Sequence, residues 1–183
     1  MRWEALFGDL EAQLAAARAA SDEAAATDLL RVEQARVALV DRLAGSLAQA
    51  LKVRTGNGQG FSGRLAYVGA EWLVLTEGQR SVLVPFAAIL SIEGLGRAVG
   101  PRPAGIHARL GLASAYRALA RDRVHVSVYA GSPATVSEGT LDRVGADFLE
   151  VALVPPGEYR RAANVRAVVA LPFAAVAAVA SHP

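Results

Sequence analysis

The chain has 183 residues, of which 53% are hydrophobic and 20% charged, and its formal net charge at pH 7 is +2. This composition is typical of a globular protein with one ordinary domain or two small ones. The absence of cysteine excludes disulfides, thiolate metal sites and cysteine nucleophiles. With only three histidines as well, we expect neither a bound metal nor a cofactor.

The N-terminal sequence lacks the features of a targeting signal. It begins Met1-Arg2-Trp3-Glu4, with more acids soon after and no apolar signal-peptide core. No apolar run reaches the ~18 residues that a membrane helix needs. The longest run, residues 167–180, contains a proline at Pro172. We therefore expect a cytoplasmic protein that has no membrane partner.

The first 50 residues predict a helical arm. One face of an acidic helix carries large apolar side chains. These are Trp3, Leu6, Phe7, Leu10 and Leu14. A second helix is expected over residues 24–50, because Ser21 or Asp22 can cap its N-terminus. The two helices would form a hairpin or a coiled coil with another chain, and packing on the strands of the same chain is the alternative.

A stretch of thirteen residues occurs twice in similar form, with six identical positions. GRLAYVGAEWLVL begins at Gly63, and GTLDRVGADFLEV begins at Gly139. A second pair of blocks follows in the same order, VPFAAILSI from Val84 and LPFAAVAAV from Leu171. The extra residues of the second copy fall in the segment 155–166, whose composition is typical of a surface loop. The pattern predicts a tandem structural repeat.

Each copy of the repeat predicts five short strands preceded by a helix. The expected strands are 51–54, 61–68, 72–76, 81–84 and 89–92, then 124–129, 136–144, 147–153, 165–171 and 176–180. The leading helices are 24–50 and 106–121. VGAE and VGAD place a glycine in a turn where a positive φ is expected. PFAA begins a tight helical turn before the last strand of each copy.

A leading helix, five strongly bent strands and a short turn before the fifth resemble an Sm-like small barrel. SH3-like barrels lack the leading helix and are the second choice. The chain also resembles an uncharacterised group of proteins from high-GC bacteria that carry VGADWLxL…VPxAAV segments. The resemblance implies an α+β fold with two tandem five-stranded antiparallel barrels. Its parts would be a helical arm (1–50), a first barrel (51–95), an Arg-rich linker and helix (96–121) and a second barrel (122–183).

The Sm-like resemblance does not bring an RNA site with it. Sm-type sites use an Asp and usually an Asn after the second strand, and an Arg-Gly pair near the end of the fourth. In this chain the corresponding positions hold Gly69 and Gly145, Leu73 and Leu149, and Pro85-Phe86 and Pro172-Phe173. Sequence-specific RNA recognition is therefore not expected from the resemblance.

Two further surfaces are candidates for binding. Trp72 and Phe148 are expected to point outward, on the same strand face as Glu150, and to form a contact surface for another repeat or chain. Coverage by the N-terminal arm is the alternative. The middle segment 96–123 carries six arginines against one Asp, namely Arg97, Arg102, Arg109, Arg117, Arg121 and Arg123. Arg109, Arg117 and Arg121 share one face of the predicted helix, and this face would hold phosphate groups. The alternative is an ordinary solvated helix face.

Catalytic patterns are weak throughout the chain. GNGQG, at residues 56–60, lacks the Lys-Ser/Thr of a phosphate loop, and neither Ser46 nor Ser132 lies in a nucleophile elbow. We therefore expect no enzyme and no small-molecule substrate. The sequence predicts a non-enzymatic interaction or scaffold protein that self-associates or binds a protein partner. Sequence-tolerant binding of RNA or DNA through the Arg-rich segment is the alternative.

Overall fold

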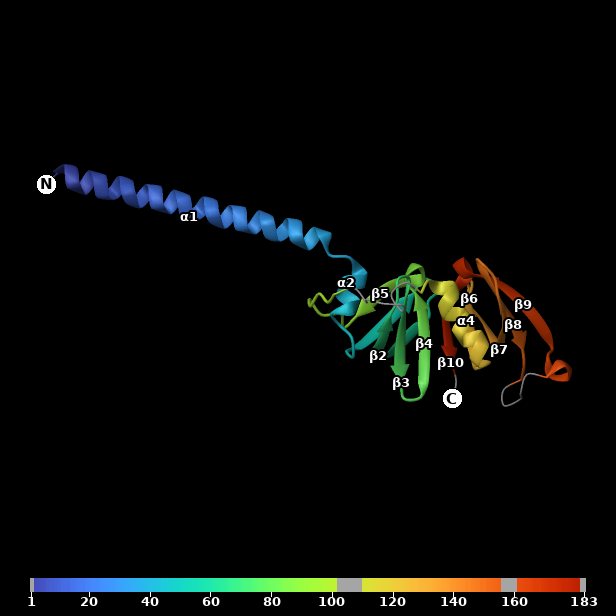
Figure 1. Ribbon diagram of the computed structural model, residues 1–183. Helices are drawn as coiled ribbons and strands as arrows, with labels where there is room; N and C mark the ends of the chain where they lie inside the picture. The colour runs from blue at the N-terminus through green and yellow to red at the C-terminus, as the bar shows by residue number, and fades with distance from the viewer. Residues whose placement is uncertain (1, 102–109, 156–160, 182–183) are drawn as a thin grey trace. The chain divides into compact units, whose positions relative to one another are not determined.

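The structure is a computed structural model that describes residues 2–101, 110–155 and 161–181 (Figure 1). Its described residues divide into two compact units, Met1–Ala38 and Leu39–Pro183. Each unit is described separately below. Within the described residues, no helix is both long enough and apolar enough to span a membrane.

The first unit is a single helix, α1 (Arg2–Arg36). The predicted break at Ser21 or Asp22 is wrong, because both residues lie inside the helix. No glycine or proline occurs between Asp9 and Arg36, and the segment is rich in Ala, Leu, Glu and Arg, which favour helix. Local pairs add support, such as the ion pair between Arg36 and Glu33 at 2.9 Å. A helical hairpin is therefore absent from this described segment.

The second unit contains the repeats. The helices of its described residues are α2 (Leu39–Ala44) and α4 (Leu112–Asp122). The strands of the first repeat are β1 (Ala50–Thr55), β2 (Gly60–Val68), β3 (Trp72–Glu77), β4 (Arg80–Pro85) and β5 (Ile89–Glu93). Those of the second are β6 (His125–Ala130), β7 (Thr135–Val144), β8 (Phe148–Leu153), β9 (Ala167–Pro172) and β10 (Val176–Ser181). The 3₁₀ turns are η1 (Phe86–Ala88), η2 (Ala162–Asn164) and η3 (Phe173–Ala175).

The ten strands lie where the sequence predicts them, whereas the helices differ in extent. The predicted helix 24–50 is divided between the end of α1 and the short α2. The second leading helix begins at Leu112, and residues 106–109 of its predicted range lie outside the described residues. The chain is thus an α+β protein, with a short helix ahead of each set of five strands.

The strands form one open antiparallel sheet in the order β5-β1-β2-β3-β4-β10-β6-β7-β8-β9. The prediction of two closed five-stranded barrels is therefore wrong. Closure of the first repeat would require β4 to pair with β5, but β4 pairs with β10 instead. The three-residue turn η1 leads into β5, which pairs with β1 on its other side. Figure 1 shows the red strand β10 beside the green strand β4.

Two hydrophobic cores lie on opposite faces of the central strands. Successive side chains of a strand point to opposite faces. In β4, Val82 and Val84 join the first core and Leu83 joins the second. In β10, Ala180 joins the first core and Val179 joins the second. The centre of the sheet is therefore covered on both faces, so the two repeats share their packing.

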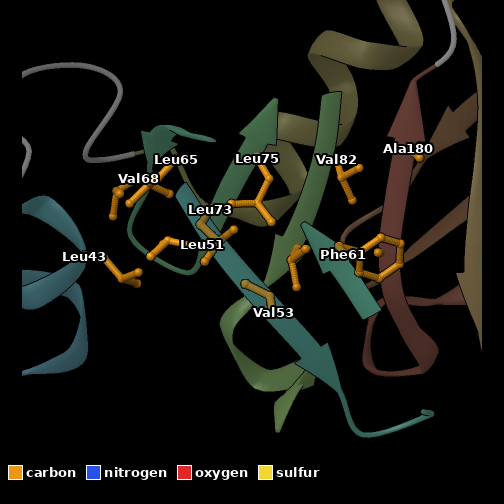
Figure 2. Packing of buried hydrophobic residues seen from close by; sticks show 12 residues of the cluster. Leu43, Leu51, Val53, Phe61, Leu65, Val68, Leu73, Leu75, Val82 and Ala180 are labelled. Atoms are coloured by element: carbon orange, nitrogen blue, oxygen red, sulfur yellow. The ribbon is translucent and has the colours of Figure 1, made fainter. Parts of the chain in front are cut away.

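The first core is built mainly from repeat 1. It contains Leu43, Leu51, Val53, Phe61, Leu65, Val68, Leu73, Leu75, Val82, Val84, Ala178 and Ala180. Figure 2 shows Leu43 of α2 and Ala180 of β10 on opposite sides of this cluster. The second core contains Trp72, Leu83, Ala115, Tyr116, Val126, Val128, Leu141, Leu149, Val151, Val176 and Val179. Each core thus receives side chains from both repeats.

Tyr116 of α4 is fully buried in the second core, and its ring packs edge-on against Phe173 with centroids 5.1 Å apart. Its hydroxyl has no hydrogen-bond partner among the described residues. A buried polar group without a partner destabilises the folded state. Burial also raises the pKa of the Tyr116 hydroxyl above its ordinary value.

Replacing Tyr116 with phenylalanine is expected to raise the free energy of unfolding at pH 7 by about 1 kcal/mol. The ring packing is retained and the unpaired hydroxyl is removed. Because the folded state holds the Tyr116 proton more tightly than the unfolded state, stability falls as the pH rises above the ordinary tyrosine pKa of about 10. Urea unfolding at neutral and alkaline pH measures both effects. A variant that is less stable, with the same alkaline loss as the wild type, would contradict this account.

Candidate interaction surfaces

Trp72 is a buried residue of the second core, with 8% of its surface exposed. Its indole Nε1 donates a hydrogen bond to the carbonyl oxygen of Leu110 at 3.0 Å. The neighbouring Glu71 Oε2 accepts a bond from the backbone N–H of Leu112, at the first residue of α4, at 3.2 Å. Trp72 therefore lies on the face of β3 that is opposite the first core, and the surface that it contacts is repeat 2 with α4 rather than solvent or the N-terminal arm.

A glycine lies beneath the repeated aromatic residue in both repeats. A Cβ at Gly69 would overlap the indole of Trp72, and one at Gly145 would overlap the ring of Phe148. The N–H of each glycine also bonds the carbonyl oxygen of its aromatic residue at 2.8 Å. Neither glycine has a positive φ, so the predicted reason for a glycine in this turn is wrong. Glycine is present because any larger side chain would overlap the aromatic ring. The spacing of VGAEW and VGADF reflects this contact.

Phe148 is half-buried, whereas the equivalent Trp72 is buried. The helix α4 approaches the same turn, where the Arg117 guanidinium donates a hydrogen bond to the carbonyl oxygen of Gly145 at 3.0 Å. In the equivalent turn of repeat 1, the carboxylate of Glu71 accepts a hydrogen bond from the backbone N–H of Leu112. Phe148 keeps an exposed part, and its place in an interaction surface stays a prediction.

The structure separates the predicted arginine surface into parts. Arg102 and Arg109 lie outside the described residues. Arg97 is exposed, and the adjacent Gly96 carbonyl accepts a bond from Arg42 at 2.6 Å. Arg121 and Arg123 are also exposed near the end of α4. Since Arg117 bonds its own chain, the described residues do not bring three free guanidinium groups onto one helix face.

The apolar side chains of α1 are exposed. Trp3 is 71% exposed and Phe7 is 59% exposed, and Leu10 and Leu14 are each about half exposed. All described side chains of this helix are exposed. Large apolar groups that gather on one helix face are typical of protein–protein contacts.

The two edge strands of the sheet are exposed as well. Val168 of β9 is 52% exposed and Leu90 of β5 is 72% exposed. The strands that correspond to them in the other repeat, β4 and β10, lie in the middle of the sheet, where residues 82–85 and 176–180 are buried. The sequence indicates that edge strands exist, but only the sheet order identifies them as β5 and β9.

A pocket of about 540 Å³ lies where the turns of both repeats meet the start of α4. Its walls are mostly apolar and include Phe86 and Phe173, and among the described residues that line it the one charged group is Glu71. The Glu71 carboxylate already binds the Leu112 N–H. Within the described segments, no group of three or more His, Cys, Asp and Glu side chains could hold a metal ion.

No protein-family model matches the chain, and no curated protein matches its sequence. The sheet edges and the α1 face therefore stand as candidate surfaces on geometry alone. Of the two, the sheet edges have a direct internal precedent, because the chain itself joins equivalent strands at its centre.

Proposed function

We propose that this protein is a non-enzymatic scaffold that self-associates by pairing β9 of one copy with β5 of the next. One observation carries the proposal. Within the chain, β4 of the first repeat pairs with β10 of the second, antiparallel, with Leu83 opposite Val179. The repeats are equivalent in sequence, so β9 corresponds to β4 and β5 corresponds to β10. The pairing of β4 with β10 at the centre of the sheet is called the internal junction. The edge strands β9 and β5 are the second copies of the two strands that form it.

The register of the internal junction predicts the register between copies. VPFAAILSI and LPFAAVAAV align Leu83 with Ala170 and Val179 with Ile92. Pairing between copies would accordingly place Ala170 opposite Ile92. This contact joins different surfaces of the two partners, so it continues head to tail until the assembly closes into a ring or extends as a filament.

The composition of the edges supports the same proposal. Edge strands of soluble proteins are commonly protected from pairing by charged residues or by prolines. The sequence of β9 is AVVALP, without a charge, and its proline lies at the last position. The equivalent proline, Pro85, likewise stands at the last position of β4, and β4 pairs with β10 through residues 81–83. Neither feature blocks the addition of a strand to β9.

The contact between copies would be more polar than the internal junction. Ser91 and Glu93 of β5 correspond to Ala178 and Ala180 of β10, which are both fully buried. Burial of polar groups reduces the stability gained from an interface. We therefore expect an association that depends on protein concentration.

Two single substitutions test the proposal. Ala170→Glu and Leu90→Glu each place a charge on an exposed position of one edge, where the folded monomer tolerates it but a paired edge does not. Each variant is expected to form smaller species than the wild type in light scattering. An equimolar mixture is expected to form larger species than either variant alone, because each retains the edge that the other lacks.

The matched control is Ala118→Glu, at an exposed position of α4, which should assemble like the wild type. Circular dichroism verifies that each variant is folded. A wild-type protein that is monomeric at all concentrations would overturn the proposal. Edge variants that assemble normally, or a mixture that gains no mass, would overturn the head-to-tail contact.

A further inference from the structure

The apolar face of α1 has the spacing of a coiled-coil seam. Seven exposed positions follow one another at alternating steps of four and three residues. They are Trp3, Phe7, Leu10, Leu14, Ala17, Ser21 and Ala24. A helix of 35 residues is about 52 Å long, and most helices in proteins owe their stability to the packing of one face. This face therefore requires a partner.

The seam changes character along its length. Its first four members are large, and its last three are small. A parallel pair in register would place each large residue opposite its own copy, Leu10 against Leu10, and each small residue against a small one. The end that contains Ala17 and Ala24 would then be poorly packed, since close contact there would require the large residues at the other end to overlap.

An antiparallel pair avoids this mismatch. With Leu14 opposite Ala17, Leu10 lies opposite Ser21 and Phe7 lies opposite Ala24 of the second helix. Every one of these layers then combines a large and a small side chain, which allows an even distance between the helix axes. The apolar layers extend from Phe7 to Ala24, and Trp3 lies opposite Asp28 at the end of the seam.

The flanking charges favour the same register. Glu11 and Arg18 each follow a seam residue, and both are exposed. In the antiparallel pair Glu11 of one helix lies beside Arg18 of the other, and the two-fold axis repeats this pair. In the parallel pair the neighbours of Glu11 and Arg18 are Leu6 and Gln13, which carry no charge.

We infer that α1 pairs antiparallel with α1 of a second copy, with Leu10 opposite Ser21. This contact is independent of the sheet edges and adds a second self-association surface to the proposed scaffold. Each chain then binds other copies through two different surfaces, a helix seam and a strand edge.

Cysteine cross-linking in the full chain tests the pairing, because the wild type has no cysteine. One Leu10→Cys chain and one ¹⁵N-labelled Ser21→Cys chain are mixed under mild oxidation, and mass spectrometry identifies the products. Both chains also carry Ala170→Glu, so that β9 cannot bring them together. The mixed disulfide is expected to form in at least tenfold excess over either homodimer. In the antiparallel pair, identical positions lie eleven residues apart, about 16 Å, which is beyond disulfide reach.

The matched control is the mixture of Ala12→Cys with Ala19→Cys, whose positions face away from the seam and should not cross-link. Homodimers of the single variants in preference to the mixed product would show a parallel pair and overturn the inference. Cross-linking that is no faster than in the control would show that α1 does not pair with α1 of a second copy, and it would also overturn the inference. Neither result depends on whether β9 and β5 associate, so the two proposals fail separately.

Discussion

Replacing Trp72 with alanine is expected to lower the free energy of unfolding by about 3–5 kcal/mol. The side chain belongs to repeat 1 but packs in the second core, where it contacts the segment ahead of α4. Its removal leaves a cavity at the joint between the repeats and removes the indole bond to the Leu110 carbonyl. Chemical denaturation followed by far-UV circular dichroism measures the loss.

Two further variants separate the contributions to this loss. Trp72→Phe keeps an aromatic ring over Gly69 and loses the hydrogen bond, so we expect a loss of about 1–2 kcal/mol. Phe148→Ala removes the equivalent ring of repeat 2, and we expect a loss of about 1–3 kcal/mol because this ring is only half-buried. A Trp72→Ala protein of wild-type stability that fails only in self-association would show that Trp72 serves an external contact.

Replacing Gly139 with alanine is expected to destabilise the protein by about 3 kcal/mol, at the upper end of the usual range for overpacking. A Cβ at this position would overlap the carbonyl oxygen of Ala152 on the neighbouring strand β8 and lie 2.8 Å from its carbonyl carbon. Both are backbone atoms, so β7 and β8 would have to separate. The midpoint of urea unfolding reports the change.

Gly63 opens the first copy of the repeat and occupies the equivalent place. Its Cβ would lie 2.8 Å from the Thr76 carbonyl oxygen, a milder conflict, and we expect Gly63→Ala to cost about 1–2 kcal/mol. Gly60→Ala is the control, since no atom lies within 4 Å of the position where its Cβ would be. Equal stability of the Gly139 and Gly60 variants would contradict the close approach of the strands.

The sequence repeat predicts the ten strands because each short apolar run is bounded by glycine, proline or polar residues. It does not predict closure. Closure of a barrel depends on which edge strands pair with each other. The sequence of β4 is compatible with pairing to either β5 or β10. Pairing partners far apart in the chain leave no local pattern. The same limit explains why one open sheet replaces two closed barrels.

The burial of Trp72 shows which part of the prediction depends on the folded chain. The alternation of faces is correct, since Leu73 and Leu75 enter the first core and Trp72 lies on the opposite face. The opposite face was expected to contact another repeat or another chain, or to be covered by the N-terminal arm. In β3 that face meets α4 and repeat 2. Periodicity identifies the two faces of a strand but not what covers each of them.

The helices show the same limit in another form. Ser21 and Asp22 have the chemistry of helix caps, yet they lie within α1, because capping residues are tolerated inside a strong helical sequence. Arg117 has the spacing of a phosphate-binding stripe, but its guanidinium group reaches the Gly145 carbonyl across a gap of 28 residues in sequence. Only the folded chain brings that turn and α4 together.

The position of β10 has a consequence for the order of events during synthesis. This strand is the last one in the described chain, yet it lies at the centre of the sheet between β4 and β6. Ser181 bonds the Ser81 carbonyl oxygen 100 residues earlier. While the ribosome is still translating, repeat 1 therefore has an open strand at β4 and an incomplete core. Completion of both cores must therefore wait until β10 has been synthesised, and during that interval the unpaired edge of β4 is open to pairing with other chains.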